Sequence, residues 1–249
     1  MSNFSDFAGS GGGGYIYTEQ PYDATKYALA NKTGLLDRSD LASGNSWTQK
    51  TSGATARKDH SAVEYNGKMY MFGGYDGSNS LNDLWEYDIA GDSWTQKTSG
   101  ASTRDSQSAV VYGGKMYVFG GYDAYGSTYY NDLWEYDIAN NSWTQKTSGA
   151  TARKDHSAVV YGDKMFIFGG IDSIGNDSRN LYSYDFVSTN YTQLVDFTSD
   201  EREGDSCIVY KNIMYEFGGE KSYGSIFYNE LYAYTIQEEY VGKVLIPII

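Results

Sequence analysis

The chain has 249 residues with 26 tyrosines and 29 glycines but only two prolines, a composition rich in strand formers and turn formers. Its formal net charge of −13 argues against nucleic acid or an anionic membrane surface as a partner, because both require a basic surface. The single cysteine excludes an intramolecular disulfide framework, and the lack of a run of 18 apolar residues argues against membrane insertion.

Residues 1–20 differ in composition from everything that follows. Two aromatic residues, Phe4 and Phe7, stand among serines and aspartates and are followed by a run of four glycines. Such a segment suits a short anchor with a flexible tether. It also resembles the leaders that attach structural proteins to tailed-phage virions. We therefore expect residues 1–20 to bind other structural proteins of an assembly.

Residues 34–50 are an incomplete copy of a unit that recurs later in the chain. The stretch DRSDLASGNSW, which ends at Trp47, is a degenerate version of WEYDIAGDSW further on. We expect two strands here. Two more strands of the same unit would have to come from Gly13–Glu19 or from the C-terminal stretch VLIPII.

The rest of the chain consists of four repeats of 47 to 49 residues, at about 55–98, 102–147, 151–195 and 200–243. The nineteen residues Asn45–Val63 recur letter for letter at Asn141–Val159, and a close copy lies between them at Asp92–Val110. A more degenerate copy spans Asn190–Val209. Fixed periods of this length mark solenoids, propellers or arrays.

Each repeat predicts four short antiparallel strands, here called a, b, c and d. In the first repeat, HSAVEY and KMYMFGG flank Asn66-Gly67, a strong signal for a tight hairpin turn. After a loop, DLWEYDI and SWTQK form a second pair of strands. Repeated four-stranded units of this kind bury both faces by stacking radially as propeller blades.

The repeats also resemble the kelch family. Its pattern, a Gly doublet followed by a Tyr and then a Trp, occurs as Gly73-Gly74, Tyr87 and Trp94, and again as Gly120-Gly121, Tyr136 and Trp143. The third and fourth repeats keep Gly169-Gly170 and Gly218-Gly219 but replace the Trp. The resemblance covers about residues 40–243 and implies a β-propeller.

We therefore expect an all-β, kelch-type β-propeller over residues 21–249, with four complete four-stranded blades and a partial one at about 34–50, five blades in all. A four-bladed propeller with one additional strand is the alternative, and completion by a neighbouring subunit stays open.

The topology divides the loops between two faces. The a–b and c–d turns are short, whereas the d–a and b–c loops are long and lie together on the other face. We expect this loop face to bind a ligand or partner, because repeat scaffolds commonly place function in such loops. Its candidate residues are Arg57, Arg104, Arg153, Arg202, His60, Gln107, His156, Tyr125, Tyr129, Tyr130, Tyr223, Phe227 and Tyr228.

The same residues also admit structural roles. A repeated arginine can pair with Asp59 or Asp155 or with a backbone carbonyl, and the loop tyrosines can pack between blades. Tyr and Arg are nevertheless enriched where binding energy concentrates. The two interpretations differ in exposure: a structural role predicts that these side chains are packed, and a binding role predicts that they face solvent.

Catalysis, cofactors and metals are not expected. No catalytic motif is present, and His60 and His156 as metal ligands would need a third partner close by. Some kelch propellers are copper oxidases that join a Cys to a Tyr. Here Cys207 replaces an alanine of strand a, which favours a small buried side chain.

Three functions compete. The first is a virion component, such as a phage tail or appendage protein, that serves assembly or recognises a host glycan or protein. The second is an intracellular kelch adaptor that binds a partner protein. The third, an enzyme, has the least support from the residues.

Overall fold

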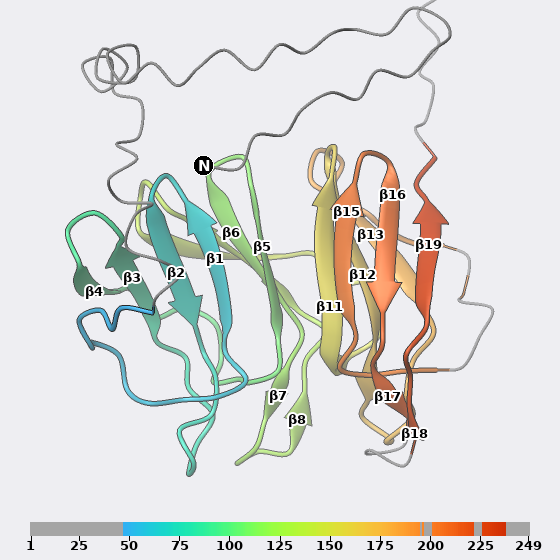
Figure 1. Ribbon diagram of the computed structural model, residues 1–249, viewed down its shortest axis with the longest axis horizontal. Coiled ribbons are helices and arrows are strands. Elements are labelled where there is room, and N and C mark those ends of the chain that lie inside the picture. Colours follow the sequence, from blue (N-terminus) through green and yellow to red (C-terminus); the bar gives the residue numbers. More distant parts are fainter. Residues whose placement is uncertain (1–46, 195, 197–200, 222–225, 238–249) are drawn as a thin grey trace, which may run out of the picture. The chain divides into compact units, whose positions relative to one another are not determined.

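The computed structural model describes residues 47–194, 196, 201–221 and 226–237. All regular elements in this part are β-strands, and the four main sheets follow one another in chain order (Figure 1). These strands belong to one compact unit that begins at Lys50. Within the described ranges, no helix is long and apolar enough to cross a membrane. The prediction of an all-β, bladed fold is confirmed.

The first three blades are antiparallel meanders of four strands each. Blade 1 contains β1 (Ser61–Tyr65), β2 (Lys68–Phe72), β3 (Leu84–Asp88) and β4 (Ser93–Lys97). Blade 2 contains β5 (Ser108–Tyr112), β6 (Lys115–Phe119), β9 (Leu133–Asp137) and β10 (Ser142–Lys146). Blade 3 contains β11 (Arg153–Tyr161), β12 (Lys164–Asp172), β13 (Leu181–Asp185) and β14 (Tyr191–Gln193).

Blade 4 has three strands in the part of the chain that the structure describes: β15 (Ser206–Tyr210), β16 (Ile213–Phe217) and β19 (Leu231–Thr235). Two short hairpins extend the b–c loops of blades 2 and 4: β7 (Tyr122–Asp123) with β8 (Thr128–Tyr129), and β17 (Glu220–Lys221) with β18 (Ile226–Phe227).

Several predicted elements lie outside the described residues. These are the leader 1–20 with Phe4 and Phe7, most of the partial blade 34–50, the loop residue Tyr223, and the fourth strand of blade 4 near Tyr240. The described end of the partial blade, residues 47–50, forms no strand.

The a–b turns have the geometry that the sequence predicts. Asn66 and Gly67 have φ angles of 51° and 73°, and the flanking Tyr65 and Lys68 pair directly. Gly113 and Gly114 take the same place in blade 2, with φ angles of 57° and 76°. Left-handed φ at both central residues is the requirement of the tight hairpin turn, so the turn residues set the register of strands a and b.

The core is a series of apolar layers between successive blades. Phe72 and Leu84 of blade 1 pack with Met116 and Tyr136 of blade 2, and all four side chains are buried. Equivalent layers lie between blades 2 and 3 and between blades 3 and 4. Alternate residues of a strand point to opposite faces of its sheet, so a blade packs one face against the preceding blade and the other face against the following one.

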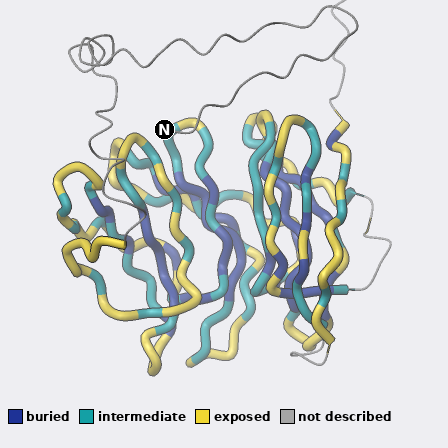
Figure 2. Tube along the Cα trace, viewed as in Figure 1, coloured by how far each residue is buried: buried dark blue, intermediate teal, exposed yellow. Residues whose placement is uncertain are grey.

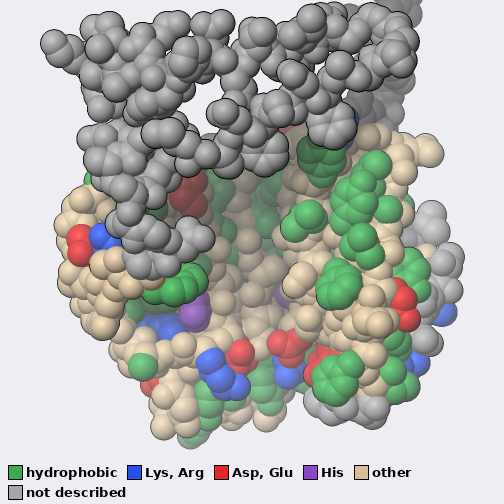
Figure 3. Space-filling model, in the orientation of Figure 1, with side chains coloured by type: hydrophobic (Ala, Val, Ile, Leu, Met, Phe, Trp, Pro, Cys, Tyr) green, Lys and Arg blue, Asp and Glu red, His purple; other side chains and the backbone are tan. Residues whose placement is uncertain are grey.

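Blade 4 exposes the face that the earlier blades bury. Phe217 and Leu231 are 52% and 63% exposed, whereas their equivalents Phe119 and Leu133 are fully buried. Exposed segments recur along β15 and β19 in Figure 2, and Figure 3 shows hydrophobic side chains gathered over these strands on the right. The described residues therefore contain no fifth layer that covers this face.

This difference predicts unequal costs for one substitution at two equivalent positions. Phe119→Ala removes a buried ring and should lower the free energy of unfolding by about 3–5 kcal/mol. Phe217→Ala removes a half-exposed ring and should cost less than about 1 kcal/mol. Urea unfolding of both variants of the full chain measures this. Equal losses would mean that the blade 4 face is covered in solution.

Candidate functional site

The first strands of the four blades line a common axis. β1 contacts β5, β5 contacts β11, and β11 contacts β15 (Figure 1). Near the start of each of these strands one residue has left-handed φ, at 52° to 66°: Asp59, Ser106 and Gly204 precede β1, β5 and β15, and Asp155 is the third residue of β11. The backbone N–H of each later one donates to the carbonyl of the one before it, at 2.8, 3.0 and 2.8 Å. These bonds connect the blades around the axis.

The repeated arginine binds the Gly doublet of its own blade. In blade 2, Arg104 Nη1 donates to Gly120 O at 2.9 Å and forms an ion pair with Asp132 at 2.7 Å. The Arg104 carbonyl in turn accepts the N–H of Gly74, the second glycine of the preceding blade, at 2.9 Å. We call this arrangement the blade clasp, because one residue ties its own blade to the preceding one.

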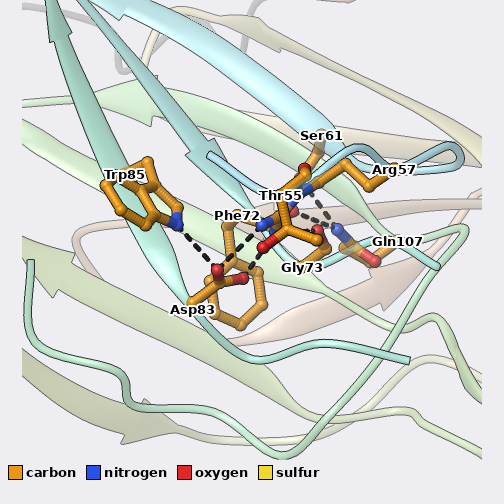
Figure 4. A network of polar contacts seen from close by, with 8 residues as sticks. All are labelled: Thr55, Arg57, Ser61, Phe72, Gly73, Asp83, Trp85 and Gln107. Carbon is orange, nitrogen blue, oxygen red and sulfur yellow. Dashed lines mark hydrogen bonds and ion pairs between the residues drawn. The ribbon is translucent and has the colours of Figure 1, made fainter. Parts of the chain in front are cut away.

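The bond from the arginine to its own Gly doublet recurs in every blade, and the bond to the preceding blade recurs in blades 2, 3 and 4. Figure 4 shows it in blade 1, where Arg57 bonds to Gly73 O and Asp83, and Trp85 Nε1 donates to the same carboxylate at 2.6 Å. Arg153 and Arg202 donate to the equivalent carbonyls at 2.7 and 3.0 Å. The four guanidinium groups are buried inside the blades.

This burial decides between the two interpretations of the arginines. The structural role with a backbone carbonyl holds, but Asp59 and Asp155 are the wrong partners, since they pair with Lys58 and Lys154. Arg104 is fully buried and provides no donor to a ligand on the loop face. The expectation of an arginine-rich recognition surface is therefore wrong for the molecule in this conformation.

The second glycine of each doublet is required by space as well as by conformation. A Cβ at Gly74 would lie 2.7 Å from the carbonyl oxygen of Lys58, and the residue has a φ of 97°. At Gly121 the corresponding distance to Asp105 O is also 2.7 Å, with a φ of 98°. Any side chain here would push strand b away from the d–a loop.

The candidates His60, Gln107 and His156 occupy one equivalent position, directly after the residue with left-handed φ. Gln107 is buried and its Nε2 donates to Phe72 O of the preceding blade at 2.8 Å. His156 is buried in the same place, with Nε2 2.8 Å from Ser108 Oγ. Burial, with the charge of Arg153, lowers the pKa of His156 to about 3, so the ring stays neutral. His60 of the first blade is exposed.

The loop tyrosines divide into two groups. Tyr130 and Tyr228 cover the buried arginines, with the Arg104 and Arg202 guanidinium carbons 4.2 and 4.4 Å from the ring centres. Tyr129 packs on Tyr122 at 4.8 Å. These three tyrosines are half-buried and pack against the scaffold, as the structural interpretation predicts, and a contact with a partner stays a prediction.

Three large apolar side chains on the loop face point into solvent. Tyr125 is 91% exposed, Ile174 is 80% exposed and Phe227 is 75% exposed. They lie on the b–c loops of blades 2, 3 and 4, one on each. The sequence indicated Tyr125 and Phe227 as candidate residues of the loop face. It gave no indication of Ile174, because a single isoleucine in a polar loop is not unusual.

The d–a and b–c loops enclose a cavity of about 430 Å³ around the axis, with residues from all four blades in its wall. A smaller cavity of about 190 Å³, lined by His60, Gln107, His156 and Asp205, adjoins it. Acidic and basic side chains are seen together at the lower end of the hollow in Figure 3. The larger cavity is thus a concave site on the loop face to which every blade contributes.

Charged side chains dominate the larger cavity. Its wall contains two lysines, Lys58 and Lys154, and five carboxylates: Asp59, Asp105, Asp155, Glu203 and Glu220. Most of these carboxylates are not indicated by the repeated arginine, which was the clearest sequence signal in the d–a loops. The residue directly after the arginine indicates them, because it is charged in all four repeats: Lys58, Asp105, Lys154 and Glu203.

The described residues provide no evident metal or nucleophilic centre. No group of three or more His, Cys, Asp and Glu side chains among them is arranged to hold a metal ion. The thiol of Cys207 donates to Asp205 Oδ2 at 3.3 Å, and burial raises its pKa. A thiol with a raised pKa is a poor nucleophile and a poor metal ligand.

Comparisons with known proteins agree with this geometry. A family model described as the KLHDC2/KLHL20/DRC7 Kelch-repeats domain matches residues 13–145 and 97–244. Among solved structures, one described as "Structure of YjhT" is similar with a TM-score of 0.65 and 17% identity. The match covers 70% of this chain, and this chain covers 63% of that one. No curated protein matches the chain.

The division of the tyrosines predicts different effects of two Tyr→Ala substitutions. Tyr130→Ala uncovers Arg104 and should lower the free energy of unfolding by about 2 kcal/mol, through lost burial and a lost cation–π contact. Tyr125→Ala should leave it within about 0.5 kcal/mol. Thermal or urea unfolding measures both, and a stable Tyr130→Ala variant would contradict the scaffold role.

Proposed function

The chain belongs to the kelch-repeat family, as its match to the KLHDC2/KLHL20/DRC7 Kelch-repeats domain shows, and from that premise we propose that it is a non-catalytic protein-interaction module. The proposed binding surface is the loop face: the charged cavity together with Tyr125, Ile174 and Phe227. The observation that supports it most is that these exposed apolar side chains stand on three successive blades beside one cavity.

The chemistry of the loop face suits a macromolecular partner. Exposed aromatic and aliphatic side chains around a polar depression provide the apolar contacts that dominate protein interfaces, and the cavity provides specificity. The rings that could compete for this role, Tyr130 and Tyr228, are already in use against the arginines. Catalysis is not proposed, since the half-buried thiol of Cys207 has a raised pKa and the buried ring of His156 has a pKa lowered to about 3, which suit neither a nucleophile nor a general base.

Binding should depend on the apolar residues of the loop face. The triple variant Tyr125→Ser, Ile174→Ser and Phe227→Ser should lose a partner that the wild-type chain retains, by about tenfold or more in affinity. Ile89→Ser with Val187→Ser is the matched control, because both side chains are exposed on c–d turns of the opposite face. Capture from host-cell extract on each immobilised chain, quantified by mass spectrometry, measures this. Loss in the control variant alone would place the partner on the opposite face.

The more specific function that we propose is that of a virion component, a propeller of a phage tail or appendage. Residues 1–20 would attach it to other structural proteins, and the loop face would recognise a host glycan or protein. The resemblance of the leader to those of virion proteins supports this assignment. An intracellular kelch adaptor is the alternative, and it would use the same loop face without the attachment.

The leader can be tested separately from the propeller. A chain that lacks residues 1–20 should unfold at the same temperature as the full chain, because the repeats do not include the leader, but it should no longer co-purify with assembled particles. Phe4→Ala with Phe7→Ala in the full chain should have the same effect on assembly. Normal incorporation of both variants would exclude the anchor.

A further inference from the structure

The charges of the axial cavity alternate from blade to blade. At the residue after the clasp arginine, blades 1 and 3 have Lys58 and Lys154, whereas blades 2 and 4 have Asp105 and Glu203. In blades 1 and 3 the next residue is an aspartate, and in blades 2 and 4 it is uncharged Ser106 or Gly204. Two blades therefore contribute a lysine with its own counterion, and two contribute an acid without one.

The two lysines are already occupied within the cavity wall. Lys58 Nζ is 2.9 Å from Asp59 and lies over the ring of Tyr75, and Lys154 Nζ is 3.1 Å from Asp155 and lies over the ring of Tyr122. Each lysine thus has a carboxylate and an aromatic face. The positive charge of each lysine is balanced by a carboxylate of its own blade.

Glu203 is the clearest uncompensated group. It is 4% exposed and lines the cavity, and among the described residues no hydrogen bond or ion pair reaches its carboxylate. The groups that act on it are Asp155, Asp177 and Glu220, opposed by Lys154 alone. Burial and these carboxylates raise the pKa of Glu203 to about 7. A nearby positive charge would relieve this repulsion.

Asp105 repeats this pattern on blade 2. It is 7% exposed, and its carboxylate accepts a hydrogen bond from Ser80 Oγ at 2.6 Å but pairs with no basic side chain among the described residues. Burial raises its pKa, and the charge of Asp59 adds to the effect. Two buried acids on non-adjacent blades therefore border one cavity in which every basic side chain is already paired.

We propose that the axial cavity binds the cationic side chain of a lysine or arginine from a partner protein, with Glu203 and Asp105 as its counterions. The proposal rests on the protein-interaction function above and names the chemistry that the loop face selects. A guanidinium or ammonium group on a flexible stem fits better than a metal ion, since the carboxylates around the cavity do not converge as metal ligands do. The volume of about 430 Å³ accommodates such a side chain.

Capped pentapeptides, Gly-Gly-Xaa-Gly-Gly amides with Arg, Lys, Gln or Glu at the centre, test the charge preference. Titration into the ¹⁵N-labelled full chain at pH 8 should shift the amide resonances of Ser106 and Gly204 for the Arg and Lys peptides. The Gln peptide should bind at least tenfold more weakly, and the Glu peptide should not bind. Preference for the Glu peptide would overturn the proposal in favour of an anionic ligand.

Variants of the two acids test which groups carry the recognition. Glu203→Gln with Asp105→Asn should reduce affinity for the Arg peptide at least tenfold, while the fold is retained, because the amides remove an uncompensated charge. Glu64→Gln, an exposed acid of β1, is the matched control and should bind like the wild type. Equal affinity of the double variant and the control would show that the binding is not at this cavity.

The pH dependence separates a direct contact from a general effect of net charge. The wild-type chain should bind the Arg peptide several-fold more weakly at pH 5.5 than at pH 8, because Glu203 becomes neutral as the pH falls through its raised pKa. Glu203→Gln should lose most of this dependence. If the Arg peptide fails to bind while the apolar triple variant still loses its partner, the ligand class is wrong and the interaction function stands.

Discussion

The blade clasp is the interaction on which the rest of this molecule depends. A buried guanidinium is costly unless its donors are satisfied, and here each one meets the carbonyl of its own Gly doublet. In blades 2, 3 and 4 the carbonyl of the arginine also accepts an N–H from the preceding blade, so the interaction fixes the orientation within a blade and the spacing between blades together. In blade 3, Arg153 keeps the bond to its Gly doublet, although Asn180 stands where blades 1 and 2 have an aspartate. Burial lowers the pKa of Arg153 to about 10.

Because the clasp uses the arginines internally, the character of the loop face is set by what remains. The lysines pair with adjacent aspartates, Gln107 and His156 bond between blades, and Tyr130 and Tyr228 cover guanidinium groups. What remains is acidic in the cavity and apolar on the loop tips. In blades 1 and 3 the lysine and aspartate of the duplicated segment RKDH neutralise each other, so the negative charge excess of the cavity comes from Asp105 of blade 2 and from Glu203 and Glu220 of blade 4.

Strands and turns could be predicted because each depends on local sequence. Asn66-Gly67 needs left-handed φ whatever its surroundings, and the alternation in HSAVEY is visible in one strand. The direction of Arg104 could not be predicted in this way. Its partners Gly120 and Asp132 lie 16 and 28 residues away, and an arginine in a polar loop gives the same pattern whether it faces solvent or a carbonyl. The acids of the cavity were missed for a related reason, since their proximity arises only when four repeats meet at one axis.

The exposed face of blade 4 has a consequence for how such a chain can grow. One face of each blade carries the apolar residues that the next blade covers, and the opposite face covers the preceding blade. Equivalent positions of the repeat form these two faces in successive blades. The interface is therefore templated by the repeat itself, and an additional copy of one unit carries both halves of a complementary contact without any compensating substitution. A verbatim duplicate is then already adapted to its neighbours at the moment it arises. Selection can afterwards alter the axial residues of single copies, while the contacts between copies stay unchanged.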